Sequence, residues 1–228
     1  MPHAVDASAI LDRLAASRGG MRNAFERIDP QRTAHLIVDM QNGFMEEGAP
    51  VEVPQARTIV ENINRVSAAV RKAGGLNIFI RYTTPADGDD SWSVMYARLG
   101  QMAGVHKNAF QPGSHYWELW PELEVEPQDR VVAKGRFSAF TPGTSGVDDV
   151  LREAGIETVI VTGTLTNVCC ESTARDAMQH NYRVIMVPDA NAALSDAAHT
   201  ATLESLALVF ADLRSTDEVE GLLAVAEA

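Results

Sequence analysis

Cysteine is scarce in this sequence: there are two in 228 residues, and these two, Cys169 and Cys170, are neighbours. Adjacent cysteines cannot form an ordinary structural disulfide, so the chain does not read as a secreted scaffold held by cross-links. No apolar run approaches the ~18 residues that a membrane span needs. The first residues, Met-Pro-His-Ala-Val-Asp, also lack the charged and then apolar layout of a signal peptide. We therefore expect a cytoplasmic protein.

Basic residues are also few, with 19 Lys and Arg against 31 Asp and Glu and a formal net charge of −12. Nucleic acids and anionic membranes need basic patches that offset phosphate charge, so neither is expected as a main partner. The composition, 46% hydrophobic and 22% charged, is that of a soluble globular protein. A small-molecule substrate remains compatible with this charge, because such a ligand feels only its pocket.

Short apolar segments alternate with segments of helical spacing along most of the chain. This alternation predicts a parallel sheet covered by helices on both faces, in a single α/β domain. The expected strands are 34–39, 76–82, 130–134, 157–162, 182–187 and 210–214, and the expected helices are 54–73, 147–154, 169–180, 195–209 and 216–226.

Two segments fall outside this alternation. Residues 1–30 carry a helical pattern and are expected to be an extension that packs on the main domain, 31–228, or on a neighbouring subunit. Residues 83–128 are long, irregular and rich in aromatic residues. Ordered insertions of this kind are usually lids or pocket walls.

Three reactive side chains fall at the expected carboxyl ends of strands, where open α/β sheets bind ligands. Asp39 ends the first strand, Lys134 ends the third, and Cys169 opens the helix after the fourth. A thiol at a helix N-terminus near an ammonium group favours the thiolate, and a carboxylate can move its proton. Each residue also has a purely structural interpretation: Asp39 could form a turn, Lys134 could be solvated, and Cys169 could be a small core residue.

Three motifs carry a resemblance to a known family. They are Val-Asp-Met-Gln-Asn-Gly-Phe at 38–44, Lys-Gly-Arg-Phe-Ser-Ala-Phe at 134–140, and Gly-Thr-Leu-Thr-Asn-Val-Cys-Cys-Glu-Ser-Thr-Ala-Arg-Asp-Ala at 163–177. Together they resemble the isochorismatase-like cysteine hydrolases, over residues 33–215. Within that superfamily the third motif is similar to that of ureidoacrylate hydrolases and of N-carbamoylsarcosine amidase-type enzymes.

The resemblance implies a three-layer α/β/α fold with a six-stranded, mostly parallel sheet. It implies a catalytic triad of Asp39, Lys134 and Cys169, and a cis peptide at Thr164–Leu165. The N–H groups of Leu165 and Cys169 would form an oxyanion hole. The implied activity is hydrolysis of a C–N bond in a small amide, carbamoyl or ureido compound through a thioester. A homo-oligomer, dimer or tetramer, is also implied.

The resemblance further bears on metals and on the pocket. The segment after the second strand, residues 81–90, has no histidine, and its Asp87, Asp89 and Asp90 read as a solvated acidic loop. We therefore expect no metal and no cofactor. The candidate substrate-binding residues are Gln41, Phe44, Tyr82 and Phe137, of which Gln41 could instead orient Asp39. Phe137 stands where ureidoacrylate hydrolases have tyrosine, so their specificity is not carried over.

Two other functions compete with the amidohydrolase. One is an isochorismatase-type vinyl-ether hydrolase that uses Asp39 and does not need the thiol. The other is a non-enzymatic module of the same fold. The presence of Cys169 favours amide or carbamoyl substrates over the first, and the presence of all three reactive side chains counts against the second.

Overall fold

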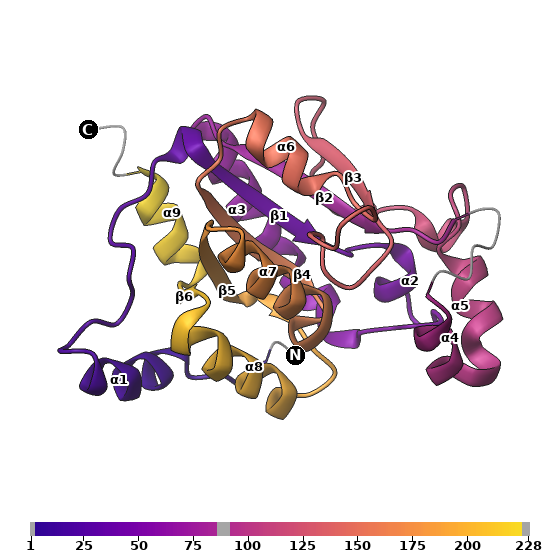
Figure 1. Ribbon diagram of the computed structural model, residues 1–228, viewed down its shortest axis with the longest axis horizontal. Coiled ribbons are helices and arrows are strands. Elements are labelled where there is room, and N and C mark those ends of the chain that lie inside the picture. Colours follow the sequence, from indigo (N-terminus) through magenta and orange to yellow (C-terminus); the bar gives the residue numbers. More distant parts are fainter. Residues whose placement is uncertain (1–2, 86–91, 225–228) are drawn as a thin grey trace.

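The computed structural model describes residues 3–85 and 92–224, and in this part of the chain six strands form one sheet (Figure 1). The strand order is β3-β2-β1-β4-β5-β6, and every pairing is parallel. The predicted α/β class is confirmed, with a sheet that is wholly rather than mostly parallel. The strands are β1 (Thr33–Val38), β2 (Leu76–Tyr82), β3 (Arg130–Lys134), β4 (Thr158–Thr164), β5 (Arg183–Ala192) and β6 (Asp212–Leu213).

Helices cover both faces of this sheet and give it two separate buried cores. Leu36 and Val38 of β1 face one core with α6, α7 and α8, whereas Ile37 faces the other with α3 and α9 (Figure 1). The helices are α1 (Ala7–Ser17), α2 (Asn42–Met45), α3 (Val60–Lys72), α4 (Ser93–Leu99), α5 (Ala103–Ala109), α6 (Val147–Glu153), α7 (Glu171–Gln179), α8 (Asp196–Val209) and α9 (Thr216–Ala224).

The helix predicted over 54–73 divides into a 3-10 segment, Pro54–Ile59, and α3. Apolar residues at steps of three and four put one face of α3 into the core. The helix ends as its glycines predict, because Gly74 takes a positive φ of 79° and the N–H of Gly75 donates to Val70 O at 2.9 Å.

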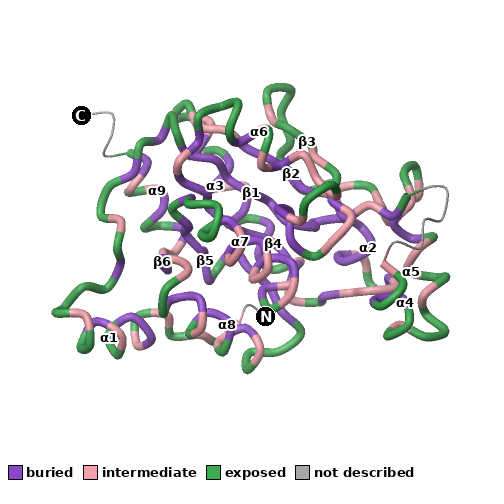
Figure 2. Tube along the Cα trace, in the orientation of Figure 1, coloured by how far each residue is buried: buried purple, intermediate pink, exposed green. Residues whose placement is uncertain are grey.

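The insertion between β2 and β3 is less irregular than its sequence indicates. It contains α4 and α5, which lie beyond the carboxyl end of β2 (Figure 1). Figure 2 shows both helices as largely intermediate or exposed, in contrast to the buried central strands. Most of their side chains therefore face solvent rather than a core.

The N-terminal helix α1 lies beside α8 and buries Ile10 and Leu11 in the core on that face (Figure 1). In the described residues, we find no helix long and apolar enough to cross a bilayer.

Candidate active site

The first candidate side chain, Asp39, follows β1 in a left-handed backbone conformation with φ 53°. Such a conformation is uncommon for residues other than glycine and is found at functional sites. The neighbouring strand β4 passes very close to this point, because Gly163 is paired with Val38. A Cβ at Gly163 would lie 2.2 Å from Val38 O, so only glycine fits there. This close approach brings the residues after β4 next to Asp39.

Lys134, the last residue of β3, reaches Asp39 across the end of β2. Its Nζ lies 2.7 Å from Asp39 Oδ2, and both side chains are fully buried. The ammonium also donates to Arg136 O at 2.9 Å and lies 5.3 Å from the centre of the Tyr82 ring. A buried charge needs such partners, since desolvation would otherwise be costly. The two groups therefore form one buried ion pair.

Cys169 completes the group from the other side. It lies in a π-helical turn, Thr166–Cys170, that precedes α7. The predicted helix over 169–180 is therefore π-helical up to Cys170 and becomes an α-helix only from Glu171. The residue is 4% exposed, and its thiol lies close enough to Asp39 and Lys134 for both side chains to act on its pKa. The structure therefore brings the three predicted side chains together. Cys170 is fully buried elsewhere, with its Sγ 3.9 Å from Thr162 O.

Burial controls the protonation of this group. It raises the pKa of Cys169 well above the ordinary thiol value; Lys134 lowers that pKa and Asp39 raises it further. Desolvation is thus the largest influence on the thiol, and it opposes the thiolate that the ammonium favours. Burial likewise raises the pKa of Asp39, although Lys134 and Cys169 each lower it.

The pKa of Lys134 is also raised. Burial lowers it, but the charges and hydrogen bonds of Asp39 and Cys169 raise it by more. The ammonium is therefore retained at physiological pH. A carboxyl group with a raised pKa is suited to moving protons near neutrality.

The two residues whose N–H groups are expected to bind an oxyanion, Leu165 and Cys169, lie between β4 and α7. The Thr164–Leu165 peptide bond is cis. Leu165 O accepts the N–H groups of Val168 (3.1 Å) and Cys170 (3.2 Å), which ties the turn to this peptide. The oxyanion hole of Leu165 and Cys169 remains a prediction.

Gln41 is fully buried, and its amide bonds the backbone. Its nitrogen donates to Tyr82 O (3.0 Å) and Trp117 O (2.9 Å), and its oxygen accepts the N–H of Tyr82 (2.8 Å). The side chain thus joins the end of β1 to the end of β2. Both polar atoms of its amide are thus engaged by the backbone, and its roles in binding substrate or orienting Asp39 stay predictions.

The three candidate aromatic residues lie in different surroundings. Phe44 is buried against Phe110, with ring centres 4.9 Å apart, and Tyr82 is buried with its hydroxyl 3.4 Å from that of Tyr96. Phe137 is 39% exposed and meets Trp92 at 4.7 Å. Of the three, Phe137 alone presents a large exposed surface.

Phe137 borders an open hollow of about 440 Å³. The hollow lies between the segment after Lys134 and helix α7, which follows the turn that holds Cys169; Asp39, Lys134 and Cys169 themselves do not line it. Its lining includes Trp92, Arg136, Phe137, Ser172, Arg175 and Asp176.

In residues 3–85 and 92–224 no group of three His, Cys, Asp or Glu side chains could hold a metal ion. Asp87, Asp89 and Asp90 lie outside the described residues. His106 packs among Tyr82, Tyr96 and Phe110, and burial lowers its pKa to about 4. His115 pairs with Glu46 at the surface.

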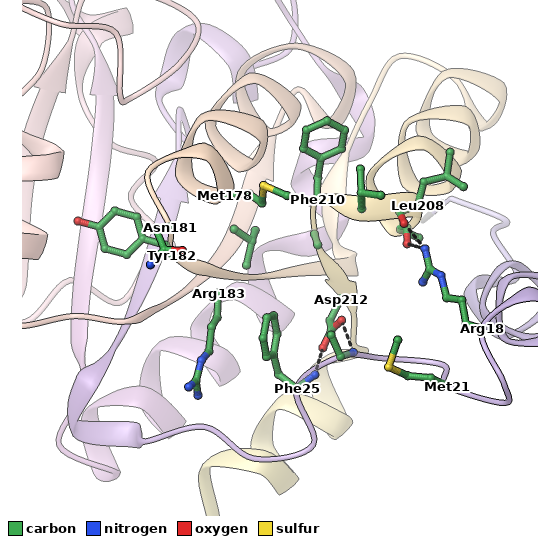
Figure 3. Close-up of a pocket in the computed structure, with 15 residues that line it drawn as sticks. Arg18, Met21, Phe25, Met178, Asn181, Tyr182, Arg183, Leu208, Phe210 and Asp212 are labelled. Carbon is green, nitrogen blue, oxygen red and sulfur yellow. Dashed lines mark hydrogen bonds between the residues drawn. The ribbon is translucent and has the colours of Figure 1, made fainter.

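A larger hollow, of about 560 Å³, lies at the opposite edge of the sheet (Figure 3). It is bounded by the first residues of β5 and β6, Arg183 and Asp212, and by the segment after α1. Asp212 accepts the N–H groups of Ala24 and Phe25 there, as Figure 3 shows. Ligands of such sheets bind at the carboxyl ends of strands, so this hollow is not the candidate active site.

The sequence analysis singled out neither Thr166, the first residue of the π-helical turn, nor His199, which lies in α8. The Nδ1 atom of His199 and the hydroxyl of Thr166 are hydrogen bonded at 2.8 Å, and both residues are fully buried. One signal was available: His199 lies four residues after the N-cap Ser195, on the inner face of α8.

The sequence and the fold of the chain were compared with those of known proteins. The isochorismatase domain model matches residues 33–218. The chain is 32% identical to ureidoacrylate amidohydrolase RutB of Pseudomonas savastanoi pv. phaseolicola, over 84% of each chain. It superposes on a cysteine hydrolase from Pseudomonas syringae pv. phaseolicola with TM-score 0.82 and 31% identity, covering 90% of this chain and 98% of the other.

A second solved structure, N-carbamoylsarcosine amidase from Thermoplasma acidophilum, gives TM-score 0.67 and 26% identity, covering 82% of this chain and 98% of the other. The family match spans most of the chain and includes all three buried side chains. The protein therefore belongs to the isochorismatase family.

Proposed function

We propose that the protein is a cysteine-dependent amidohydrolase that cleaves a C–N bond in a small amide, carbamoyl or ureido compound. The observation that carries this proposal is the buried contact of the Cys169 thiol with the Asp39–Lys134 pair. A nucleophile, a proton carrier and a fixed cation at one edge of the sheet form a hydrolytic group. The amidohydrolase and amidase among its relatives support the same reaction class.

In the first step, the Cys169 sulfur attacks the carbonyl carbon while Asp39 accepts the thiol proton. A C–S bond forms, and the carbonyl electron pair moves to oxygen. The N–H groups of Leu165 and Cys169 hold this oxyanion, and loss of one such donor would cost about 3 kcal/mol in the barrier. Lys134 stays protonated and balances the negative charge of the reacting group. Because the resting thiol is neutral, proton transfer accompanies attack.

In the second step, the carbonyl re-forms, the C–N bond breaks, and Asp39 returns its proton to the departing nitrogen. Ammonia or an amine leaves, and a thioester on Cys169 remains. Water then attacks the thioester, with Asp39 as the base, and Cys169 recovers its proton when the C–S bond breaks. The hollow beside Trp92 and Phe137 is the candidate approach to this group, because Arg136 and Phe137, which line it, follow Lys134 closely in the chain. Assembly into a homo-oligomer stays a prediction from the family resemblance.

The experiment is an assay of ammonia and carboxylate release across small amides, carbamoyl compounds and ureides. Cys169→Ala should abolish turnover of every active compound. Cys170→Ala is the matched control, because its thiol lies one residue away but contacts Thr162 O instead of Asp39. Activity on a vinyl ether that survives in Cys169→Ala would instead support the vinyl-ether hydrolase. Binding without turnover would support the non-enzymatic module.

A further inference from the structure

We propose that His3 is a positioning residue of the active site, through which the N-terminal segment fixes the turn that carries Leu165 and Cys169. The inference rests on the function proposed above for this turn. It concerns a residue about 160 positions away in the chain, outside the part that the family model matches.

Both ring nitrogens of His3 are engaged by the segment that follows β5. Its Nε2 accepts the N–H of Ala193 at 2.9 Å, and its Nδ1 donates to Asp196 Oδ1 at 2.7 Å. The His3 side chain is only 3% exposed. A histidine so near the start of a chain, with both nitrogens bonded and its ring enclosed, is firmly held.

The first connection to the active site runs through stacked rings. The His3 ring lies on the ring of His199, with centres 4.2 Å apart and planes 14° from parallel. His199 in turn is hydrogen bonded with the Thr166 hydroxyl at 2.8 Å. Thr166 is the first residue of the π-helical turn that contains Cys169. A shift of His199 would therefore displace the beginning of this turn.

The second connection runs through the backbone of β5. Ala193, which donates to His3, follows Ala192, whose carbonyl accepts the Thr164 hydroxyl at 3.3 Å. The two connections therefore end on Thr164 and Thr166, the residues on either side of Leu165. His3 supports both flanks of the peptide whose N–H is assigned to the oxyanion.

General anchoring of the N-terminal segment has other sources. Asp6 caps α1 by accepting the N–H of Ala9 at 2.9 Å, and Ile10 and Leu11 bury the helix in the core. Ile10 and Leu11 share a hydrophobic core with Cys169, but this is apolar packing without a hydrogen bond, whereas His3 reaches the turn through a stacked ring and hydrogen bonds. Removing the His3 ring should thus loosen the turn without detaching α1.

A loosened turn should affect the transition state more than substrate binding, because the oxyanion is formed only during reaction. A misplacement of about 1 Å can cost about 100-fold in rate. For His3→Ala we expect kcat to fall about tenfold with KM within about twofold, since the remaining contacts keep part of the geometry.

The test compares His3→Ala with Asp6→Ala, a matched change in the same segment that removes the cap of α1. It also compares Thr166→Val, which removes the hydroxyl, with Thr166→Ser, which keeps it. Besides kcat and KM, hydrogen exchange of residues 164–170 is measured in each protein. We expect slower turnover and faster exchange in His3→Ala and Thr166→Val, normal values in Asp6→Ala, and substantial recovery in Thr166→Ser.

Two results would overturn the proposal. One is unchanged exchange of residues 164–170 in His3→Ala; the other is an equal effect of Asp6→Ala, which would indicate general anchoring alone. The exchange measurement does not depend on activity. If no Cys169-dependent hydrolysis is found but exchange rises only in His3→Ala and Thr166→Val, the positioning stands and the proposed function fails.

Discussion

The Lys134 ammonium lies 2.7 Å from the Asp39 carboxylate, and neither side chain is exposed to solvent. Parallel register explains the meeting, because Lys134 pairs with Tyr82 at the end of β2 and Asp39 follows β1 beside it. A buried ion pair gains little over a well-packed apolar pair, but it becomes costly when one partner is removed. The pair thus links stability to the proposed chemistry.

Lys134→Met should therefore lower the free energy of unfolding by about 3–5 kcal/mol, because Asp39 loses its buried counter-ion and must either stay charged without a partner or take up a proton. Urea unfolding followed by circular dichroism measures this change. The double variant Asp39→Asn, Lys134→Met should regain part of the lost stability while remaining inactive. A double variant no more stable than Lys134→Met would contradict the pairing as the source of the loss.

The raised pKa of Cys169 has a consequence for chemical labelling. Iodoacetamide reacts with the thiolate, so labelling of the free enzyme should be slow at pH 7 and rise about tenfold per pH unit towards alkaline pH. Intact-protein mass spectrometry follows the adduct. Cys169→Ser should not label, because Cys170 is fully buried. Fast labelling with no pH dependence between pH 6 and 8 would show that the resting site holds a thiolate.

A third prediction concerns the approach of β4 to β1. Gly163→Ala should lower the free energy of unfolding by more than about 2 kcal/mol, because the new Cβ meets Val38 O and Gly163 has φ 112°. Gly104→Ala in α5 is the control: its Cβ meets nothing within 4 Å, and alanine favours helix by up to about 1 kcal/mol. Equal stability of the two variants would contradict this account of Gly163.

His35 gives a prediction for stability in acid. Burial lowers its pKa from 6.5 to about 3; Arg71 also lowers this pKa, and Asn77 and Asp129 oppose the shift. Below pH 6.5 this histidine binds a proton in the unfolded chain but not in the folded chain. The free energy of unfolding therefore decreases as the pH is lowered from about 6.5 to about 3. From pH 7.5 to pH 5 this one residue should cost about 2 kcal/mol.

The variant that tests this is His35→Gln, which can still bond Thr162 and Ser67, the partners of the His35 ring. It should be less stable at pH 7.5 but lose about 2 kcal/mol less than wild type on going to pH 5. Denaturant unfolding at the two pH values gives the comparison. Parallel losses in both proteins would assign the acid sensitivity to other groups.

Much of the fold follows from local pattern. The strands expected at 76–82 and 130–134 have those same bounds in the structure, because each is an apolar run bounded by turn residues. Helices α4 and α5 were not expected, since neither has a clear apolar face; rings such as Tyr96 and His106 pack on Tyr82 from another element. Their stability comes from contacts that no local pattern contains.

The candidate site divides in the same way. Asp39, Lys134 and Cys169 could be predicted because strand ends of a parallel sheet meet at one edge. The raised pKa of Cys169 could not be predicted, because the local sequence shows the start of a helix and a lysine but not how deeply the thiol is buried. His3 was beyond prediction for a similar reason: its contact with Ala193 spans 190 positions.

The most direct measurement is the mass of the enzyme during turnover. Wild type and Cys169→Ser are mixed with an active substrate, quenched in acid within milliseconds to seconds, and digested. The account predicts a transient acyl group on the peptide that contains Cys169 in wild type, with the mass of the substrate minus its leaving amine. Turnover at an undiminished rate in Cys169→Ser, with no acyl group on Cys169 in wild type at any time, would contradict it.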